Sequence, residues 1–509
     1  MTQIAVATTS QSAADAAREV ADLGGNAVDC ALAAALYSIN TEPGVCALGG
    51  SAFITVWRED DDPVTIDGNV AVPGAGLTDD QRGRGAVPVT LDYGGGVTTL
   101  VGPGSVAVPG TLAAIEHAWK RFGSAPWPAI FEPTVRACKE GFPLPASCRY
   151  YLGYSGDSIF NRSSDGFSAL HHDDGSMLNA GDTVVVPHLA ASLAAIADEG
   201  ARIFYEGEIA MAIAAHCQDG DGMLTADDLR TYRATERAPM RIDIGDWSIA
   251  STPPPAVGGS VLAAMILACS NLPNDSWTRD ALSQLVQSQR ACLDFRKRNL
   301  DLTDDVASEA ARLTEAARSG QLLTRWTSAS TVHTSVVDKA GTGCAITASS
   351  GYGSGEMPDG TGLWLNNCLG EIELNRRGLD AGPTGSRLPS NMAPSVARQD
   401  GTVLAVGSPG ADRITTALQQ FLINYLVFGM PLQQAIAHPR LHVDTSGEFE
   451  RLMAEPGLGL PDTGLPLTVF PDLVMYFGGV AASVYDRTSG FEAAADPRRE
   501  GGIFVSLSE

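Results

Sequence analysis

The sequence lacks long apolar runs and has no recognisable secretory leader. Its longest apolar stretches, residues 261–269 and 421–428, are far shorter than the ~20 residues that a helix needs to cross a bilayer. The first ten residues, MTQIAVATTS, contain no basic segment, no long apolar segment and no A-x-A-like cleavage site. We therefore expect a cytoplasmic protein that does not associate with membranes.

The sequence also lacks C-x-x-C motifs and clustered histidines. Its nine cysteines are scattered, odd in number and mostly in apolar contexts, which favours buried free thiols over a disulfide framework. The eight histidines show no metal-ligand spacing. Residues 219–222 (DGDG) resemble the start of a calcium loop, but Met223 stands where the next oxygen ligand belongs. We interpret this segment as a turn and expect no bound metal.

The common hydrolase and nucleotide motifs are missing too. There is no G-x-S-x-G, H-E-x-x-H, G-x-x-x-x-G-K-[ST] or strict G-x-G-x-x-G. The sequence therefore lacks the main motifs that would indicate an α/β-hydrolase, a zinc peptidase or a nucleotide-binding protein. We expect no cofactor.

Basic residues are few relative to acidic ones, and the net charge is −25. A surface this acidic repels nucleic acids and anionic lipids, which favours a small-molecule substrate. The composition, with 44% hydrophobic and 18% charged residues, is globular. A length of 509 residues predicts two or more domains or one large layered unit.

Helical patterns dominate the first two-thirds of the chain and strand patterns the last third. Ser12 and Asn26 are expected N-caps. Predicted helices cover residues 13–22, 27–38, 111–121, 129–140, 187–198, 227–233, 260–269, most of 281–315, and 412–428. Period-two strands cover residues 52–57, 64–66, 331–338, 344–349, 394–397, 403–406, 441–443, 480–485 and 503–506. This segregation predicts an α+β fold, with sheets packed on each other and helices outside in an αββα layering.

Thr331 begins a strand whose hairpin partner ends in serines. Folding the hairpin about Gly341 brings Thr331 opposite Ser349 or Ser350. A threonine hydroxyl needs a base, and cleavage of the preceding peptide bond would supply one in its own α-amine. Taken alone, the pattern favours an ordinary strand threonine.

Residues 407–412 (GSPGAD) join a strand to a long predicted helix. Free backbone N–H groups at such a junction suit an oxyanion. The alternative is a tight turn with Asp412 near the N-cap.

An ordered set of segments resembles the γ-glutamyltransferase family of N-terminal nucleophile hydrolases over nearly the full length. Each segment is weakly diagnostic, whereas their common order is specific. The segments are residues 24–29 (GGNAVD), 42–43 (EP), 48–50 (LGG), 100–102 (LVG), 108–110 (VPG), 224–232 (LTADDLRTY), 253–259 (PPPAVGG), 331–338 (TVHTSVVD), 365–367 (LNN), 392–394 (MAP), 407–410 (GSPG) and 495–498 (ADPR).

The resemblance implies a proenzyme of αββα fold that cuts itself between Ser330 and Thr331. Residues 1–330 would form a large subunit and residues 331–509 a small subunit, intertwined in one unit, with a heterotetramer as one candidate assembly. Thr331 would be the nucleophile, and Ser349 would support it. The N–H groups of Gly410 and Ala411 would form the oxyanion hole, where the family usually has two glycines.

The residues that resemble the family's substrate-binding positions depart from its pattern. Asn69 replaces an arginine that binds the α-carboxylate of glutamate, so a bidentate ion pair is lost. Cys368 replaces Gln or Glu, Ser390 and Asn391 replace a Ser-Ser pair, and Glu371 corresponds to the acid that binds the substrate amine. In addition, Val332 replaces the second threonine of the family's TTH motif.

These departures spare the chemical centre and change the recognition residues. We therefore expect acyl transfer or hydrolysis of a small-molecule amide, with a γ-glutamyl or related acyl donor. One alternative is a family-related hydrolase that cleaves a C–C bond in natural-product biosynthesis. An alternative of another class is a non-catalytic binding scaffold that retains the fold.

Overall fold

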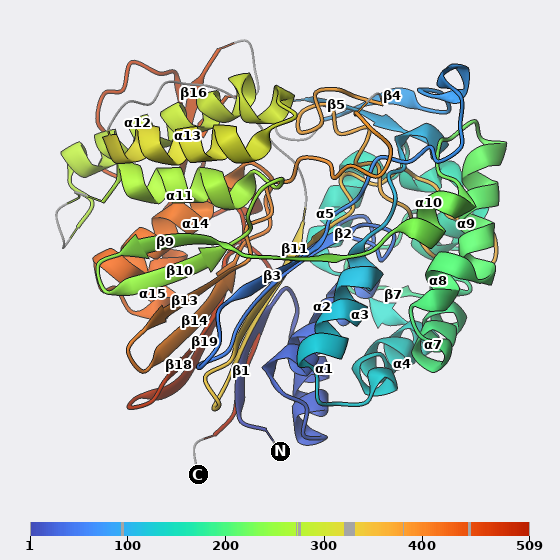
Figure 1. Cartoon of the computed structure of the whole chain (residues 1–509), viewed down its shortest axis with the longest axis horizontal. Helices are drawn as coiled ribbons and strands as arrows, with labels where there is room; N and C mark the ends of the chain where they lie inside the picture. Colours follow the sequence, from blue (N-terminus) through green and yellow to red (C-terminus); the bar gives the residue numbers. More distant parts are fainter. Residues whose placement is uncertain are drawn as a thin grey trace.

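The computed structural model describes residues 2–92, 96–270, 272, 276–319, 331–379, 381–445 and 449–507. Two large β-sheets lie face to face at its centre, and helices cover both outer faces (Figure 1). The predicted α+β class and αββα layering are therefore confirmed.

The first sheet contains the strand that directly follows Thr331. Its strand order is β20 (Gly502–Val505), β1 (Ile4–Thr8), β11 (Val332–Asp338), β12 (Gly343–Ser349), β2 (Ser51–Trp57), β3 (Val64–Gly68) and β8 (Thr235–Arg237). All neighbouring strands are antiparallel. Strands from both sides of position 331 therefore belong to one sheet, and β1 lies between β20 and β11.

The second sheet has the same mixed origin. Its order is β19 (Gly490–Ala495), β18 (Ala481–Asp486), β14 (Thr402–Gly407), β13 (Ser395–Gln399), β10 (Trp247–Ser251) and β9 (Met240–Ile244). Small apolar side chains such as Ala345 and Ala405 fill the space between the sheets. Hydrogen bonds also cross this space. The Ser335 hydroxyl donates to the Ala481 carbonyl, and the Ser483 hydroxyl donates to the Ser335 carbonyl.

Helices of the first 250 residues form the outer layer on the first sheet. Helix α2 (Ala27–Thr41) is almost completely buried and packs on β11 and β12. It begins at a capping box, in which the Asn26 side chain accepts from the N–H groups of Val28 and Asp29. The other helices on this side are α1 (Gln11–Asp22), α3 (Thr111–Phe122), α4 (Glu132–Glu140), α5 (Ala146–Ser155), α6 (Ser164–Leu170), α7 (Leu189–Glu199), α8 (Arg202–Glu206), α9 (Glu208–Asp219) and α10 (Ala226–Thr231).

Later helices cover the second sheet, on the opposite side in Figure 1. They are α11 (Gly258–Ala268), α12 (Arg279–Arg298), α13 (Val306–Ser319), α14 (Arg413–Leu422) and α15 (Leu432–Ala437). Small peripheral sheets comprise β4 (Val87–Leu91) with β5 (Val97–Val101), β6 (Phe142–Pro143) with β7 (Thr183–Val184), and β15 (Leu441–Asp444) with β16 (Arg451–Ala454) and β17 (Leu467–Val469).

Several predicted helix boundaries are wrong. Helix α1 begins at Gln11, because Ser10 rather than Ser12 is its N-cap and accepts from the Ala13 N–H. Helix α7 begins at Leu189, because His188 has a positive φ of 66° that cannot continue a helix. Helix α4 begins only at Glu132, after a 3₁₀ turn.

Two predicted long helices are interrupted. The segment 281–315 contains α12 and α13, separated by a 3₁₀ turn over Leu300–Leu302. The segment 412–428 is α-helical only over Arg413–Leu422 and continues as a π-helix over Ile423–Val427. Apolar periodicity does not distinguish a π-helix from an α-helix, because the hydrogen bonds differ by one residue while the buried face persists.

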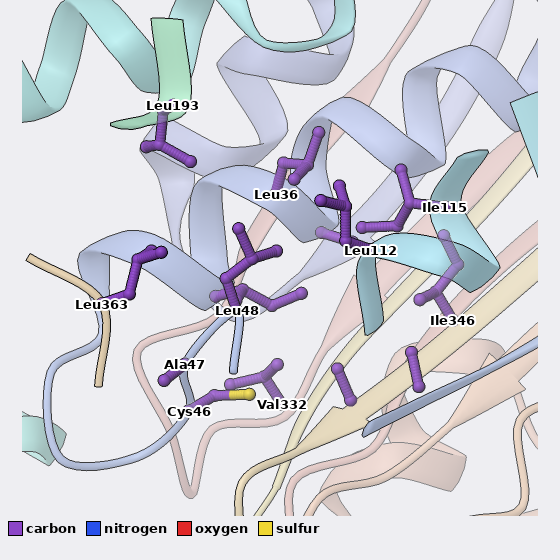
Figure 2. Packing of buried hydrophobic residues seen from close by; sticks show 14 of the residues in the cluster. Leu36, Cys46, Ala47, Leu48, Leu112, Ile115, Leu193, Val332, Ile346 and Leu363 are labelled. Carbon is purple, nitrogen blue, oxygen red and sulfur yellow. The ribbon is translucent and has the colours of Figure 1, made fainter. Parts of the chain in front are cut away.

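Val332 belongs to the large hydrophobic cluster between the first sheet and its helices. This cluster also contains Leu36, Cys46 and Leu48 (Figure 2). Successive strand residues point to opposite faces, so Val332 packs in the core while Thr331 and His333 share the other face. Val332, which stands where the family has a second threonine, therefore contributes its side chain to the packing of the core.

All nine cysteines are free and buried, as predicted. Within the described ranges, no helix has the length and apolarity needed to span a membrane.

Candidate active site

Thr331 immediately precedes β11 at the edge of a hydroxyl-rich group. The β11–β12 register pairs Val332 with Ala348, and one further residue brings Thr331 opposite Ser349, as predicted. On the next strand Ser51 pairs with Ser349, and its hydroxyl donates to the Ser349 carbonyl at 2.9 Å. Three hydroxyl side chains therefore meet on three adjacent strands.

A small hollow opens beside this group. Its volume of about 30 Å³ has room for one or two water molecules. Eight of the nine predicted site residues line it, and Gly410 lies directly before one of them. The lining residues are Ser51, Asn69, Val70, Thr331, Ser349, Cys368, Glu371, Leu374, Pro389, Ser390, Asn391, Met392, Ala411 and Ile414.

The turn between β14 and α14 contributes Ala411 to the hollow. Gly410 and Ala411 have positive φ angles of 122° and 65°, and the left-handed conformation costs an alanine about 1–2 kcal/mol. Neither backbone N–H donates to an acceptor in the described part of the chain. A strained turn that presents two free N–H groups next to a hydroxyl suits stabilisation of an oxyanion.

A buried ion-pair network fixes this turn. The Arg296 Nη1 donates to the Asp412 carboxylate at 2.6 Å, and its Nε donates to Asp301 at 3.0 Å. Burial disfavours the charge of Arg296, but the two carboxylates outweigh it and raise the Arg296 pKa. Breaking such a network by removing one partner is costly because it leaves buried charges unpaired.

The side-chain amide groups of Asn391 and Asn69 each donate a hydrogen bond within the protein. Asn391 Nδ2 donates to the Asp412 carboxylate at 2.5 Å, and Asn69 Nδ2 donates to the Leu388 carbonyl at 2.6 Å. A carboxylate and a carbonyl only accept, so both partners fix the amide orientation. The Oδ1 of Asn391 is buried, and no described residue donates to it.

Glu371 is a buried carboxyl in the hollow. Burial raises its pKa to about 8, and the nearby Glu373 adds to the shift. The Cys368 thiol lies within hydrogen-bonding reach of Glu371, and burial raises its pKa well above the ordinary value. Cys368 is therefore held as a neutral thiol, which is a poor nucleophile.

His333 faces the space between the sheets and does not line the hollow. Its Nδ1 and Nε2 lie 2.8 Å from the hydroxyls of Thr347 and Ser335. Because Ser335 donates onward to Ala481, Nε2 carries the proton and Nδ1 accepts. Burial lowers the His333 pKa to about 3, so this ring stays neutral and serves to hold the sheets together.

A larger cleft adjoins the hollow. It has a volume of about 840 Å³ and is lined by Arg233, Arg237, Arg377 and Arg387, among others. The two spaces meet at Pro389, which lines both, and the sequence neighbours Val70 and Ala71 line the hollow and the cleft, respectively. We name this space the outer cleft.

A family model described as Gamma-glutamyltranspeptidase matches residues 13–506. The chain belongs to the gamma-glutamyltranspeptidase family. It is 30% identical over 475 residues to a glutathione hydrolase proenzyme of Pseudomonas aeruginosa, covering 86% of this chain and 82% of that protein. It is 28% identical over 458 residues to a glutathione hydrolase proenzyme of Escherichia coli, covering 82% and 77%.

The fold of this family member is also found in a cephalosporin acylase of Bacillus halodurans. That crystal structure matches with a TM-score of 0.81 and 22% identity, over 100% of this chain and 96% of the acylase. The family membership and these relatives show an enzyme of the γ-glutamyltransferase type, and they favour this function over a C–C bond hydrolase or a binding scaffold.

Several lining residues were not predicted from the sequence. Ser51 directly follows the matched 48–50 segment, and Met392 opens the matched 392–394 segment, so the motifs could have indicated both. Leu374, Pro389 and Ile414 carry no such signal, because apolar residues at these positions look like ordinary core residues. Within the described part of the chain, no three His, Cys, Asp or Glu residues cluster as metal ligands.

Proposed function

We propose that the protein cuts itself before Thr331 and then transfers or hydrolyses the acyl group of a small-molecule amide through an acyl-Thr331 ester. A γ-glutamyl or related acyl group is the donor class. The observation that carries the proposal is that Thr331, Ser349 and the free N–H of the Ala411 turn meet at one hollow.

In the first half-reaction the Thr331 hydroxyl attacks the acyl carbonyl. The freed α-amine takes the hydroxyl proton, and the new oxyanion is held by the N–H groups of Gly410 and Ala411. The C–N bond then breaks, and the leaving amine takes the proton from the α-ammonium. The result is an ester on Thr331 and a free amine.

In the second half-reaction water or an acceptor amine attacks the ester. The α-amine takes a proton from the attacking group, and the Thr331 oxygen leaves and recovers that proton. Water gives the free acid, whereas an amine gives a new amide. The outer cleft adjoins the hollow and offers the space that leaving and accepting groups need.

Before the cut, the Thr331 nitrogen is part of an amide and is not a base. Activity therefore depends on cleavage between Ser330 and Thr331; Ser330 lies outside the described residues. We propose a large chain of residues 1–330 and a small chain of residues 331–509. The presence of strands from both segments in each sheet supports continued association after the cut.

Intact mass and N-terminal sequencing of the purified protein test the cut. We expect one fragment that begins at Thr331 and none in Thr331→Ala, while Thr331→Ser still cleaves. Thr334→Val is the matched control, because Thr334 lies on the same strand and contacts Thr8 instead of the hollow. A wild-type chain that stays intact would contradict the proposal.

Acylation is tested separately with p-nitrophenyl acetate. We expect a burst of p-nitrophenol and an acetyl group that peptide mapping locates on Thr331. A cytoplasmic location and a heterotetrameric assembly remain further proposals, which cell fractionation and size-exclusion chromatography with light scattering test.

A further inference from the structure

We infer that the lining of the hollow beside Thr331 selects an acyl group that carries an ammonium group and lacks an α-carboxylate. The inference rests on the proposed function, since it concerns the acyl group that Thr331 receives. It names a substrate class that differs from the γ-glutamyl group, which carries both an ammonium and a carboxylate on the same carbon.

The charge of the lining gives the first argument. Among the described residues around the hollow, none is basic, and Glu371 is the one that is acidic. A carboxylate brought into this space would meet no cation and would lie near Glu371. Burial of an unpaired charge is strongly unfavourable, whereas an ammonium would give Glu371 an ion-pair partner in addition to the neutral Cys368 thiol.

Asn391 gives the second argument. Its Nδ2 is used by Asp412, which also receives Arg296. The residue is 4% exposed, and its buried Oδ1 has no donor among the described residues. Asn391 therefore adds an unsatisfied acceptor and no positive charge to the lining, which suits an ammonium better than a carboxylate.

Asn69 is held by a similar set of hydrogen bonds. Its Nδ2 donates to Leu388 at 2.6 Å, its backbone N–H donates to Asp67 at 2.9 Å, and its carbonyl accepts from Tyr232 at 2.5 Å. These three bonds fix the residue and use its backbone N–H and one of the two N–H groups of its amide. No described residue donates to its Oδ1, so Asn69 can offer an acceptor and one neutral N–H, but no positive charge.

The hydroxyl groups do not restore a carboxylate site. Ser51 donates to the Ser349 carbonyl at 2.9 Å. Ser390 accepts from the Met392 N–H at 3.3 Å and leaves one neutral donor. A carboxylate brought here would meet only neutral hydroxyl and amide donors, so its charge would stay unpaired.

Three p-nitroanilides of equal chain length test the inference. The 4-aminobutyryl compound has only the ammonium, the γ-glutamyl compound has the ammonium and the carboxylate, and the glutaryl compound has only the carboxylate. Release of p-nitroaniline by the processed enzyme gives kcat/KM. We expect 4-aminobutyryl to exceed γ-glutamyl by at least about tenfold, and glutaryl to be slowest, because each unpaired buried charge lowers binding.

Equal or faster turnover of the γ-glutamyl compound would overturn the inference, as would absence of 4-aminobutyryl turnover. A Thr331-dependent burst with p-nitrophenyl acetate in the same preparation would leave the proposed function intact. Failure of that burst, or of the cut itself, would instead contradict the proposed function.

Two variants test the residues. The double variant Asn69→Arg with Asn391→Ser supplies a cation and a donor, and we expect it to shift the ratio of kcat/KM toward γ-glutamyl by about ten- to hundredfold. Glu371→Gln should lower turnover of the 4-aminobutyryl compound and leave that of the glutaryl compound unchanged or higher. Retained self-cleavage shows that each variant folds. An unchanged preference in both variants would contradict the assignment.

Discussion

Replacing Glu371 by glutamine should stabilise the protein, and the gain should grow with pH. The Glu371 pKa is raised from 4.5 to about 8 because the carboxyl is buried. Below pH 4.5 both the folded and unfolded states are protonated at this site. Between pH 4.5 and 8 the folded state keeps a proton that the unfolded state has lost, so the free energy of unfolding falls as pH rises.

The size of the effect follows from the shift. Each pKa unit corresponds to about 1.4 kcal/mol, so the wild-type residue costs about 3 kcal/mol at pH 7 and approaches about 5 kcal/mol above pH 8. Glutamine has no such titration. The difference in the free energy of unfolding between Glu371→Gln and the parent should therefore be small at pH 4.5 and grow steadily to pH 8.

Thermal and urea unfolding of the two proteins at pH 4.5, 6, 7 and 8 measure this difference. A Thr331→Ala background keeps both proteins as one uncut chain. Glu373→Gln is the matched control, because removal of the neighbouring charge lowers the Glu371 pKa and should shrink the pH dependence without abolishing it. A gap that is constant with pH, or that narrows as pH rises, would refute the reasoning.

Ala411→Val should slow self-cleavage at least about tenfold, because a β-branched residue resists the positive φ that the turn requires. Ala411→Gly should cleave at a near-parental rate, and gel densitometry over time measures the cleavage rate of each variant. Arg296→Met should destabilise the fold by about 3–5 kcal/mol, because buried Asp412 loses its ion-pair partner and Asp301 keeps only Arg376. Arg230→Met, in an exposed ion pair, should change the free energy of unfolding by less than about 1 kcal/mol. Turnover of an ammonium-bearing donor at limiting concentration, taken relative to the glutaryl donor, should rise with pH toward about 8 because the ionised form of Glu371 binds the cation, and this relative rise should vanish in Glu371→Gln.

From the sequence, the cross-strand partner of Thr331 could be limited to Ser349 or Ser350. Two period-two strands joined by a short turn leave a register uncertainty of one step, and a slip of one residue turns every side chain to the other face, so the choice of Ser349 required the structure. The turn at Gly410 and Ala411 was likewise predictable as a strand-to-helix junction with free N–H groups.

The orientation of the two asparagines could not be predicted from the sequence. It depends on Leu388, which is 319 residues from Asn69, and on Asp412 paired with Arg296, 116 residues away. Residue type says that an asparagine can donate or accept, and only the surrounding fold determines which remains available.

The mixing of strands from both sides of position 331 in each sheet has a consequence for refolding. The uncut chain folds as a single molecule, so correct strand pairing does not depend on protein concentration. After the proposed cut, the denatured enzyme would consist of two separate chains, and refolding would become a bimolecular reaction in competition with aggregation. The lifetime of the cut enzyme would then be set by its rate of unfolding.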